Sequence, residues 1–334
     1  MGKVISIIIP TYNMEEYLDK CLTSLIIDGM ERVEVVVVND GSRDRSIAIA
    51  QSYAERYPES FVVIDKPNGN YGSCINAGLY RATGKYVKVL DADDSFYTEN
   101  FAKMVSMLET LDVDLFLTDF VRAYADREKR ATLNRFPAGV VMDFTKECLQ
   151  DKKRLWSIWM HNIAYKRENL IRINYTQSEG IFYTDNEWKF KPMVTVKSAY
   201  YWDQPVYRYL LDREGQSVSL NVTAKHLVDD MVVTEKILKD YEEMVVMNPE
   251  MAKMYKYVVY RRVSWLYNAD LVKRGLLDNP QILEFNNRLK ELNPKMYKKV
   301  GKNRLSKLLP IHYIKMWRKN PNGLLLKLLV KLAK

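Results

Sequence analysis

The chain has 334 residues, enough to bury a sizeable core as one large domain with an appendage or as two domains. Its three cysteines match neither a disulfide framework nor a metal-binding spacing, and no stretch approaches the eighteen apolar residues that would span a bilayer. The net charge is +9, yet residues 295–334 alone contain twelve Lys or Arg and no acidic residue. A disulfide-stabilised secreted scaffold and a membrane-spanning protein are therefore excluded, and a reducing cytoplasm is favoured.

Strands and helices alternate over the first ninety residues. Residues 4–9 (VISIII) form a continuous apolar run, which is typical of a strand buried on both faces, whereas residues 14–27 carry apolar side chains at a helical period. The same cycle repeats along the chain, with strands expected at 4–9, 33–38, 61–64 and 86–90 and helices at 14–27, 44–57 and 75–82. This alternation predicts an α/β fold with a mostly parallel sheet.

The fourth of these strands runs directly into three carboxylates, Asp91, Asp93 and Asp94. Clustered negative charge at the end of a buried strand calls for a positive partner, and hard cations such as Mg²⁺ take carboxylate oxygens. Ligands of open α/β sheets also bind at strand ends. The alternative is that Asp93 or Asp94 only caps the helix expected to begin near Thr98.

Polar side chains also follow the other strands, so that one crevice should collect residues that are distant in sequence. These are Tyr12 and Asn13, then Asp40, then Lys66 and Asn68, then Asp91 and Asp93. Ordinary turn chemistry explains any one of these positions, but it explains less well an acidic group after both the second and the fourth strand.

The sequence contains neither a dinucleotide-binding G-x-G-x-x-G after the first strand nor a G-x-x-x-x-G-K-[ST] loop. Phosphate should therefore be held by a metal ion rather than by a glycine-rich loop. Together with the acidic strand end, this indicates a nucleotide-sugar site.

The chain resembles the family 2 inverting glycosyltransferases, which have the fold called GT-A. The resemblance covers roughly the first third of the chain and extends weakly to about residue 210, and it rests on residues 6–13 (SIIIPTYN), 36–44 (VVVNDGSRD), 68–78 (NGNYGSCINAG) and 82–94 (ATGKYVKVLDADD). Asn39 stands where members of the family usually have Asp. The retained Asp40 makes this departure minor.

The resemblance implies a role for each matched residue of the donor site. The nucleotide base would lie among Pro10, Tyr12 and Asp40, with Lys66 and Asn68 near the base or ribose. In the Asp91-Ala92-Asp93 stretch, Asp91 would take ribose or sugar hydroxyls, and Asp93 would bind the Mg²⁺ or Mn²⁺ that bridges the diphosphate. Alternatively, Tyr12 could simply pack under the helix that follows it.

The catalytic base of an inverting transferase removes a proton from the acceptor on the face opposite the leaving group, so it should come from another part of the chain. Family members often carry a Glu-Asp pair where this chain has Thr184-Asp185, so Asp185 is the expected base. Glu187 and Glu179 are the fallback candidates.

Residues 156–162 correspond to the family region beside the diphosphate and the acceptor. His161 could contact the leaving phosphate, although a histidine among aromatic residues is more often structural. Trp159 or Trp188 could line the acceptor pocket, because sugars pack their C–H faces on aromatic rings, but tryptophans more often belong to the core.

The sequence becomes helical after about residue 215. Helices are expected at 223–247, 249–274 and 280–292, which gives a catalytic domain over 1–215, a helical region over 216–294 and a basic amphipathic tail over 295–334. Within the tail, Lys327, Lys331 and Lys334 share one stripe of a leucine-rich helix, a pattern suited to an anionic membrane surface. The alternative is a helix docked on its own domain. Nucleic-acid binding is a weaker interpretation of the basic tail, and no nucleic-acid partner is expected.

The sequence thus predicts a cytoplasmic, metal-dependent hexosyltransferase-type enzyme that is peripheral on the inner face of the plasma membrane. It would move one sugar from a nucleotide-diphosphate donor, with UDP favoured by the resemblance, to a glycan or lipid-linked oligosaccharide of a capsule, exopolysaccharide or teichoic-type pathway. One alternative is a sugar nucleotidyltransferase, but residues 10–13 lack the glycine-rich basic loop which that activity needs. Another is a non-catalytic nucleotide-binding scaffold of an assembly complex.

Overall fold

The computed structural model describes residues 2–212, 225–306 and 310–333. It divides into two compact units, unit 1 (Met1–Lys225) and unit 2 (His226–Lys334), each of which is described by itself. The expected domain boundary at residue 215 and the expected helix start at residue 223 both lie outside the described residues.

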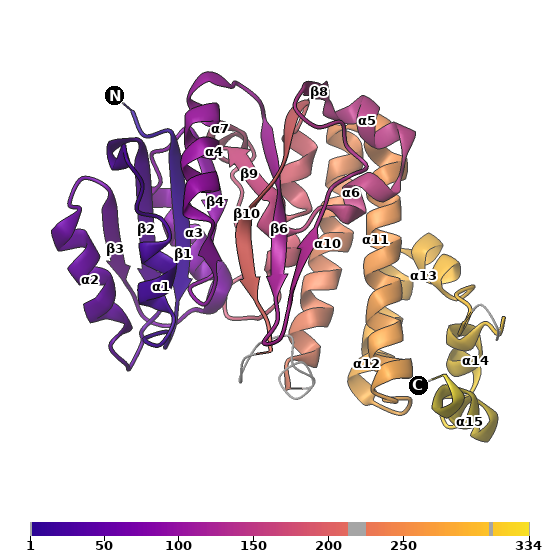
Figure 1. Cartoon of the computed structure of the whole chain (residues 1–334). Helices are drawn as coiled ribbons and strands as arrows, with labels where there is room; N and C mark the ends of the chain where they lie inside the picture. The colour runs from indigo at the N-terminus through magenta and orange to yellow at the C-terminus, as the bar shows by residue number, and fades with distance from the viewer. Residues whose placement is uncertain (1, 213–224, 307–309, 334) are drawn as a thin grey trace. The chain divides into compact units, whose positions relative to one another are not determined.

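Unit 1 is built on one twisted sheet with the strand order β3-β2-β1-β4-β9-β6-β10-β5 (Figure 1). Its first half is parallel, since β1 pairs with β2 and β4, and β2 pairs with β3. This confirms the predicted strands, which are β1 (Ile5–Thr11), β2 (Val33–Asn39), β3 (Phe61–Asp65) and β4 (Tyr86–Val89).

The second half of the sheet is mixed, which refines the prediction of a mostly parallel sheet. β9 lies between β4 and β6 and is antiparallel to both, whereas β10 is parallel to β6. The short strands β5, β7 and β8 add further antiparallel pairs. These strands are β5 (Ser95–Phe96), β6 (Leu115–Ala123), β7 (Glu128–Ala131), β8 (Val141–Asp143), β9 (Ile163–Lys166) and β10 (Ser198–Leu210).

The core of unit 1 lies on both faces of β1 and β2, whose side chains are almost all buried. On one face, Ile5, Ile7 and Ile9 belong to the same cluster as Leu18 and Phe101. The expected helix over 14–27 is shorter in the structure than predicted. The helices up to β6 are α1 (Leu18–Thr23), α2 (Ser46–Arg56), α3 (Asn70–Arg81) and α4 (Thr98–Thr110). Those that follow β6 are α5 (Phe144–Gln150), α6 (Lys153–Ser157), η2 (Met160–Asn162), α7 (Arg167–Arg172), α8 (Asp185–Trp188) and η3 (Lys191–Thr195).

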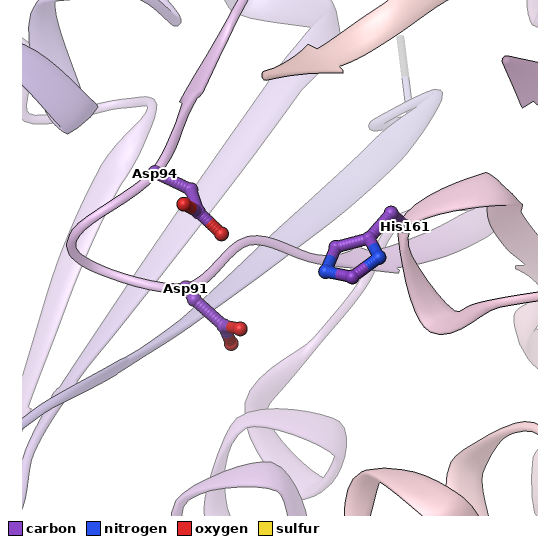
Figure 2. A group of neighbouring side chains, drawn as sticks. All are labelled: Asp91, Asp94 and His161. Atoms are coloured by element: carbon purple, nitrogen blue, oxygen red, sulfur yellow. The ribbon is translucent and has the colours of Figure 1, made fainter. Parts of the chain in front are cut away.

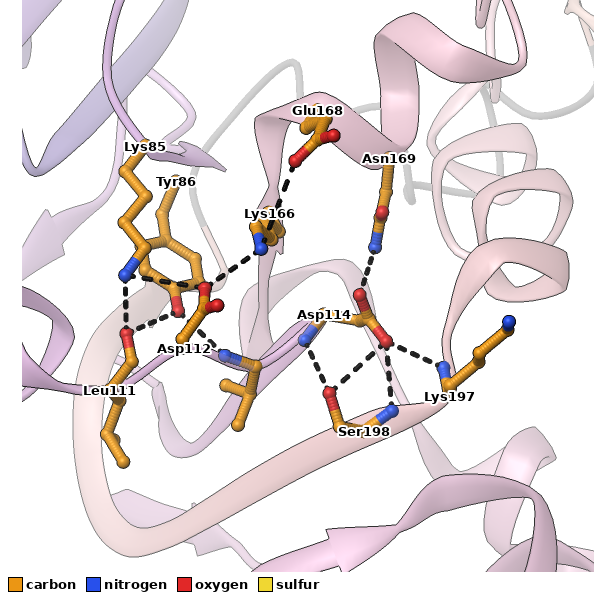
Figure 3. A network of polar contacts seen from close by, with 11 residues as sticks. Lys85, Tyr86, Leu111, Asp112, Asp114, Lys166, Glu168, Asn169, Lys197 and Ser198 are labelled. Atoms are coloured by element: carbon orange, nitrogen blue, oxygen red, sulfur yellow. Dashed lines mark hydrogen bonds and ion pairs between the residues drawn. The ribbon is translucent and has the colours of Figure 1, made fainter.

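Polar contacts around Asp112 and Asp114 join β4, β6, β9 and β10 at the amino ends of the parallel strands (Figure 3). The Asp114 carboxylate accepts from Asn169 Nδ2 at 2.8 Å and from the backbone N–H groups of Lys197 and Ser198, both at 2.9 Å. Partial burial opposes ionisation of this group, but these donors outweigh it and lower the pKa of Asp114. The network fixes the edge of the sheet opposite the strand ends that carry the predicted site.

Unit 2 is helical and confirms the helices expected at 249–274 and 280–292. Asn279 and Asn293 cap two of its helices by accepting hydrogen bonds from backbone N–H groups, and a proline follows each cap at the first helical position. The helices are α10 (Leu227–Met247), η4 (Pro249–Met251), α11 (Ala252–Tyr267), η5 (Asn268–Lys273), α12 (Pro280–Leu292), α13 (Pro294–Val300), α14 (Tyr313–Lys319) and α15 (Leu324–Leu332).

The described residues of the basic segment over 295–334 belong to unit 2, together with the helices that precede them. Val300, Ile314 and Trp317 are fully buried, and Trp317 Nε1 donates to the carbonyl of Leu277 at 2.6 Å. Large apolar side chains in this segment bury more surface by joining the preceding helices than they could in an isolated tail.

Helix α15 is docked on one side and open on the other. Leu326 and Val330 are buried within unit 2 and Leu329 is half-buried, whereas Leu324, Leu325, Leu328 and Leu332 are exposed. The alternative of a helix docked on its own domain therefore accounts for only one face of α15. Lys334, the last residue of the expected lysine stripe, lies outside the described residues. None of the described helices is both long and apolar enough to cross a bilayer.

Candidate active site

The carboxyl ends of β2 and β3 bring Asp40, Lys66 and Asn68 together, as the sequence predicted. Asp40 is only 2% exposed, and its Oδ1 accepts from Lys66 Nζ at 2.5 Å and from the backbone N–H of Gly69 at 2.9 Å. Asn68 Nδ2 donates to the backbone carbonyl of Asp40 at 3.0 Å. A buried carboxylate needs such compensation, and its partners here hold the loop after β3 against the end of β2.

The loop after β1 is tied to the same place. The backbone N–H of Asp40 donates to the carbonyl of Thr11 at 2.8 Å, and Asn13, in a left-handed conformation, accepts from the N–H of Arg43 at 2.8 Å. Pro10 is half-buried in the strand, whereas Tyr12 is 44% exposed. Its exposure counts against the alternative that Tyr12 packs under the helix that follows it, and its side chain is accessible on the loop after β1.

The end of β4 forms an acidic group with His161, which η2 supplies. Asp91, Asp94 and His161 each offer a ligand atom, and these atoms lie within 4.8 Å of one another around a common space (Figure 2). Ala92 is buried between the carboxylates, and Asp93 is partly exposed and does not belong to this group of three. The assignment of the metal to Asp93 stays a prediction.

Hydrogen bonds hold both carboxylates of the group in place. Asp91 Oδ1 accepts from the hydroxyl of Tyr71 at 2.8 Å, while Asp94 accepts from the hydroxyl of Tyr207 at 2.6 Å and from the N–H of Leu210 at 2.7 Å. Burial, followed by the charges of Asp93 and Asp91, raises the pKa of Asp94 well above its usual range. Both oxygens of Asp94 accept hydrogen bonds, and these bonds fix its carboxylate in the group with Asp91 and His161.

His161 is suited to binding a cation as a neutral imidazole. Burial, followed by the positive charges of Lys88, Arg122 and Lys189, lowers its pKa well below the usual value. Its Nδ1 is buried without a hydrogen-bond partner among the described residues, and its ring stacks on Tyr209 at 4.5 Å between centroids. An oriented imidazole with an unsatisfied buried nitrogen, next to two carboxylates, fits a divalent ion.

Lys88 supports this group, although the sequence analysis missed it. The side chain is only 1% exposed, and its Nζ donates to the carbonyls of His161 at 2.7 Å and Ile163 at 3.2 Å. Burial lowers the pKa of Lys88 to about 7. This contact joins β4 to the segment that carries His161. The sequence feature that could have identified this residue is a single lysine within the otherwise apolar strand YVKV.

The expected base, Asp185, begins α8 at the end of a loop that lies against α3. The N–H of Gly180 donates to the carbonyl of Gly69 at 2.8 Å, and a Cβ on Gly72 would lie 1.9 Å from the carbonyl oxygen of Ser178. Only glycine at position 72 permits this approach. The charge of Asp185, after burial and the charge of Asp91, helps to raise the pKa of Tyr71, so Asp185 lies near the tyrosine that donates to Asp91.

The two fallback candidates for the base have other roles in the structure. Glu187 is 1% exposed and accepts from the N–H of Ser178 at 3.0 Å, which fixes the loop before α8. Glu179 is exposed and accepts from Asn76 Nδ2 at 2.8 Å, on α3. Asp185 is the half-buried carboxylate of this segment and stays the predicted base.

The two tryptophans considered for the acceptor pocket differ in exposure. Trp188 is 1% exposed and packs edge-on against Tyr165, so it belongs to the core. Trp159 is 45% exposed, and the cationic groups of Lys189 and Arg122 lie 5.1 and 5.4 Å from its ring. Trp159 is thus the accessible aromatic surface next to His161.

The sequence profile described as Glycosyl transferase family 2 matches residues 6–173, half of the chain. The chain belongs to this family. The match spans the strand-end residues from Pro10 to His161, and it confirms both the resemblance and a glycosyltransferase role.

Curated relatives point the same way. The chain is 28% identical to the uncharacterized glycosyltransferase YibD of Escherichia coli over 273 residues, covering 77% of each chain. It is 27% identical to the uncharacterized glycosyltransferase EpsJ of Bacillus subtilis over 250 residues, covering 73% of this chain and 70% of EpsJ. The minor teichoic acid biosynthesis protein GgaB of B. subtilis is 24% identical over 86% of this chain, which corresponds to 32% of GgaB.

Among solved structures, residues 1–349 of S. aureus TarS in complex with UDP-GlcNAc superpose with a TM-score of 0.73 at 18% identity, covering 98% of this chain and 90% of that one. A mannosyltransferase from Pyrobaculum calidifontis, in complex with GDP-Man and Mn²⁺, has a TM-score of 0.50 at 15% identity. At such identities the likeness is one of fold, and it confirms the GT-A prediction.

Proposed function

We propose that this glycosyltransferase moves one sugar, with inversion, from a UDP-sugar to a glycan or lipid-linked acceptor of a surface polysaccharide. The observation that carries the proposal is that three groups lie on neighbouring segments of unit 1. They are Asp40 with Lys66 at the ends of β2 and β3, the acidic group with His161, and the separate carboxylate of Asp185. The complex of TarS with UDP-GlcNAc supports the choice of donor.

The nucleotide would bind at the ends of β1, β2 and β3. Asp40 is held by Lys66 and Gly69, so its carboxylate is fixed before a ligand arrives. It would accept a hydrogen bond from a ring N–H of the base, while the exposed ring of Tyr12 would stack on the base and Pro10 would border it. Lys66 and Asn68 would lie toward the ribose.

Asp91, Asp93 and His161 would hold Mg²⁺ or Mn²⁺, with Asp94 and Lys88 as positioning residues behind them. When bound, the ion would neutralise negative charge on the departing diphosphate. The neutral state of His161 and the hydrogen bond that holds Asp91 near it support this assignment. Asp91 could also take ribose or sugar hydroxyls.

Proton removal from the acceptor would fall to Asp185. Its carboxylate starts a helix on a segment distinct from the strand ends, as a base acting on the opposite face of the sugar must. Asn186 Nδ2 donates to Asp185 Oδ1 at 3.1 Å, which helps to orient the carboxylate. Trp159 would provide the apolar surface for the acceptor sugar, with Lys189 and Arg122 beside it.

The acceptor pathway would be that of a capsule, exopolysaccharide or teichoic-type polymer, which the similarity to GgaB supports. We place the enzyme in the cytoplasm, at the inner face of the plasma membrane, with unit 2 as the membrane-facing part. The exposed leucines of α15 and its exposed Lys327 and Lys331 support this placement.

The test is a panel of radiolabelled nucleotide-sugars, incubated with purified protein, Mn²⁺ and a membrane extract. We expect label from one UDP-sugar to appear in extractable glycan or lipid, and Asp185→Asn to abolish this transfer. Nucleotide binding without transfer from any donor would identify a scaffold. Formation of a nucleotide-sugar from a nucleoside triphosphate and a sugar phosphate would identify a nucleotidyltransferase.

A further inference from the structure

Unit 2 contains a hollow of about 530 Å³ that the glycosyltransferase site does not explain. One wall is a face of α11 that continues into η5, and the other is the segment after α13 together with the start of α14. Aromatic and cationic side chains dominate its lining, among them Tyr260, Arg261, Trp265, Lys302, Arg304 and Tyr313.

Hydrogen bonds hold the walls of this hollow together. Asn303 accepts from the hydroxyl of Tyr260 at 2.6 Å and donates to Ser264 Oγ at 2.9 Å, so the segment that carries the cations is fixed on α11. His312 lies 2.8 Å from the carbonyl of Lys302 and forms an isolated β-bridge with Arg304. The cations flanking Asn303 therefore stand on an anchored segment rather than on a loose loop.

The charge of the hollow has one sign. None of the described residues that line it is acidic, and Lys302 and Arg304 are both exposed. Trp265 is 45% exposed and presents a flat apolar surface in the same hollow. Guanidinium and ammonium groups beside an aromatic ring suit a phosphate ester carried on an apolar or sugar-like body.

The hollow neighbours the leucine-bearing helix. α15 packs on η5 and on α14, and these two elements supply Asn268 and Tyr313 to the hollow. Figure 1 shows α14 and α15 side by side in unit 2. A helix with exposed leucines, packed on two elements that line a cationic hollow, matches the two parts of a phospholipid, whose acyl region is apolar and whose head group carries a phosphate.

We propose that this hollow binds the head-group phosphate of an anionic phospholipid through Lys302 and Arg304, with Trp265 against the glycerol or acyl part, while α15 enters the bilayer surface. The proposal rests on the membrane placement of unit 2 given above, and it needs no assumption about donor or acceptor. It differs from general attraction between a basic surface and a membrane, because it requires particular cations.

The experiment compares two double variants of the full chain with the same loss of charge. Lys302→Gln/Arg304→Gln removes the cations of the hollow, whereas Lys315→Gln/Lys319→Gln removes two exposed lysines of α14 that do not line it. Co-flotation is measured with vesicles of phosphatidylglycerol and with vesicles of phosphatidylcholine. Because each basic contact with an anionic surface contributes about a fivefold change in binding, we expect the first pair to lose roughly tenfold or more and the second pair less than about threefold.

Equal losses for the two pairs would overturn the proposal in favour of nonspecific surface charge. Binding of inorganic phosphate is measured by calorimetry in the parent and in both pairs. If the parent binds phosphate, the Lys302→Gln/Arg304→Gln pair does not, and flotation shows no preference for phosphatidylglycerol, the site serves a soluble phosphate and the proposal is overturned. UDP binding with Mn²⁺ should be the same in both pairs and in the parent. This binding separates the proposal from the glycosyltransferase function, because a failed flotation test leaves UDP binding unchanged.

Discussion

Two carboxylates are buried at the strand ends of unit 1, whereas two lysines of the last helix of unit 2 lie at the surface. Asp40 and Asp94 are each 2% exposed and are held by internal donors, Lys66 for the first and Tyr207 for the second. Lys327 and Lys331 of α15 are exposed to solvent beside leucines.

This difference shows how the two kinds of charge should be interpreted. Burying a carboxylate is costly unless the fold supplies donors or a cation, and the donors to Asp40 and Asp94 offset that cost at the strand ends of unit 1. Exposed cations cost little because water solvates them. Their significance in unit 2 comes from their apolar neighbours, which water does not stabilise.

The strongest test of the buried site is Asp185→Asn, which keeps the shape of the side chain but removes its basicity. We expect transfer to fall on the order of a hundred- to ten-thousand-fold, because a positioned general base contributes that much. Donor affinity should be nearly unchanged, since the base acts on the acceptor. Steady-state transfer assays together with UDP titrations measure both quantities.

Glu179→Gln is the matched control for that variant, since Glu179 is exposed and lies in the same loop. It should retain transfer. Normal transfer by Asp185→Asn, together with loss of transfer in Glu187→Gln, would move the base to Glu187.

Variants of the acidic group test whether Asp93, which the resemblance implies, or Asp94, which lies in the group with Asp91 and His161, binds the ion. We expect Asp91→Asn and Asp93→Asn to weaken Mn²⁺-dependent UDP binding at least about tenfold. Asp94→Asn should act mainly on stability, because Asp94 accepts from Tyr207 and Leu210. Calorimetry with Mn²⁺ and thermal unfolding of the three variants decide between these effects. If Asp93→Asn leaves Mn²⁺-dependent UDP binding unchanged and Asp94→Asn abolishes it, the ion would be assigned to Asp91, Asp94 and His161 instead.

Variants of the exposed leucines of α15 test whether this helix binds a membrane surface. Leu324→Ser/Leu328→Ser removes two exposed leucines and leaves the docking residues Leu326 and Val330 in place. We expect vesicle binding to fall roughly tenfold or more, at about 1 kcal/mol or above per leucine removed from an apolar layer. Flotation at high salt isolates this apolar part, because salt screens the lysines. Unchanged flotation at high salt would show that α15 does not enter the membrane.

The smallest expected effect concerns Trp159, and Trp188 supplies the contrast. Trp159→Ala should raise the KM for the acceptor about two- to tenfold, in line with about 0.5–1.5 kcal/mol for an aromatic contact, and should leave the melting temperature nearly unchanged. Trp188→Ala should instead cost about 3–5 kcal/mol of folding stability, as a buried aromatic does. A change in UDP affinity in Trp159→Ala, with the acceptor KM constant, would place Trp159 on the donor side.

Much of unit 1 could be predicted because its signals are local. The β-branched runs of β1 and β2 identify buried strands, and the parallel order that follows brings Asp40, Lys66 and Asp91 to one edge. The residues that hold these groups could not be predicted in the same way. Tyr71 and Tyr207 contact Asp91 and Asp94 across 20 and 113 positions of the sequence, and no local pattern encodes such pairs.

The same limit applies to β9 and to helix α15. Ile163–Lys166 is a short apolar strand whose direction in the sheet depends on partners elsewhere in the chain. In α15, the buried Leu326 and the exposed Leu324, Leu325, Leu328 and Leu332 are chemically identical. Only the packing of η5 and α14 distinguishes them.

We expect unit 1 to bind a UDP-sugar through a divalent ion at the end of β4. The most direct measurement is calorimetric titration of the full chain with UDP, in Mn²⁺ and again after the ion is removed with a chelator. We expect binding in Mn²⁺, its loss with the chelator and its recovery when Mn²⁺ or Mg²⁺ is restored. Equally tight binding of UDP in the presence of the chelator would contradict the account.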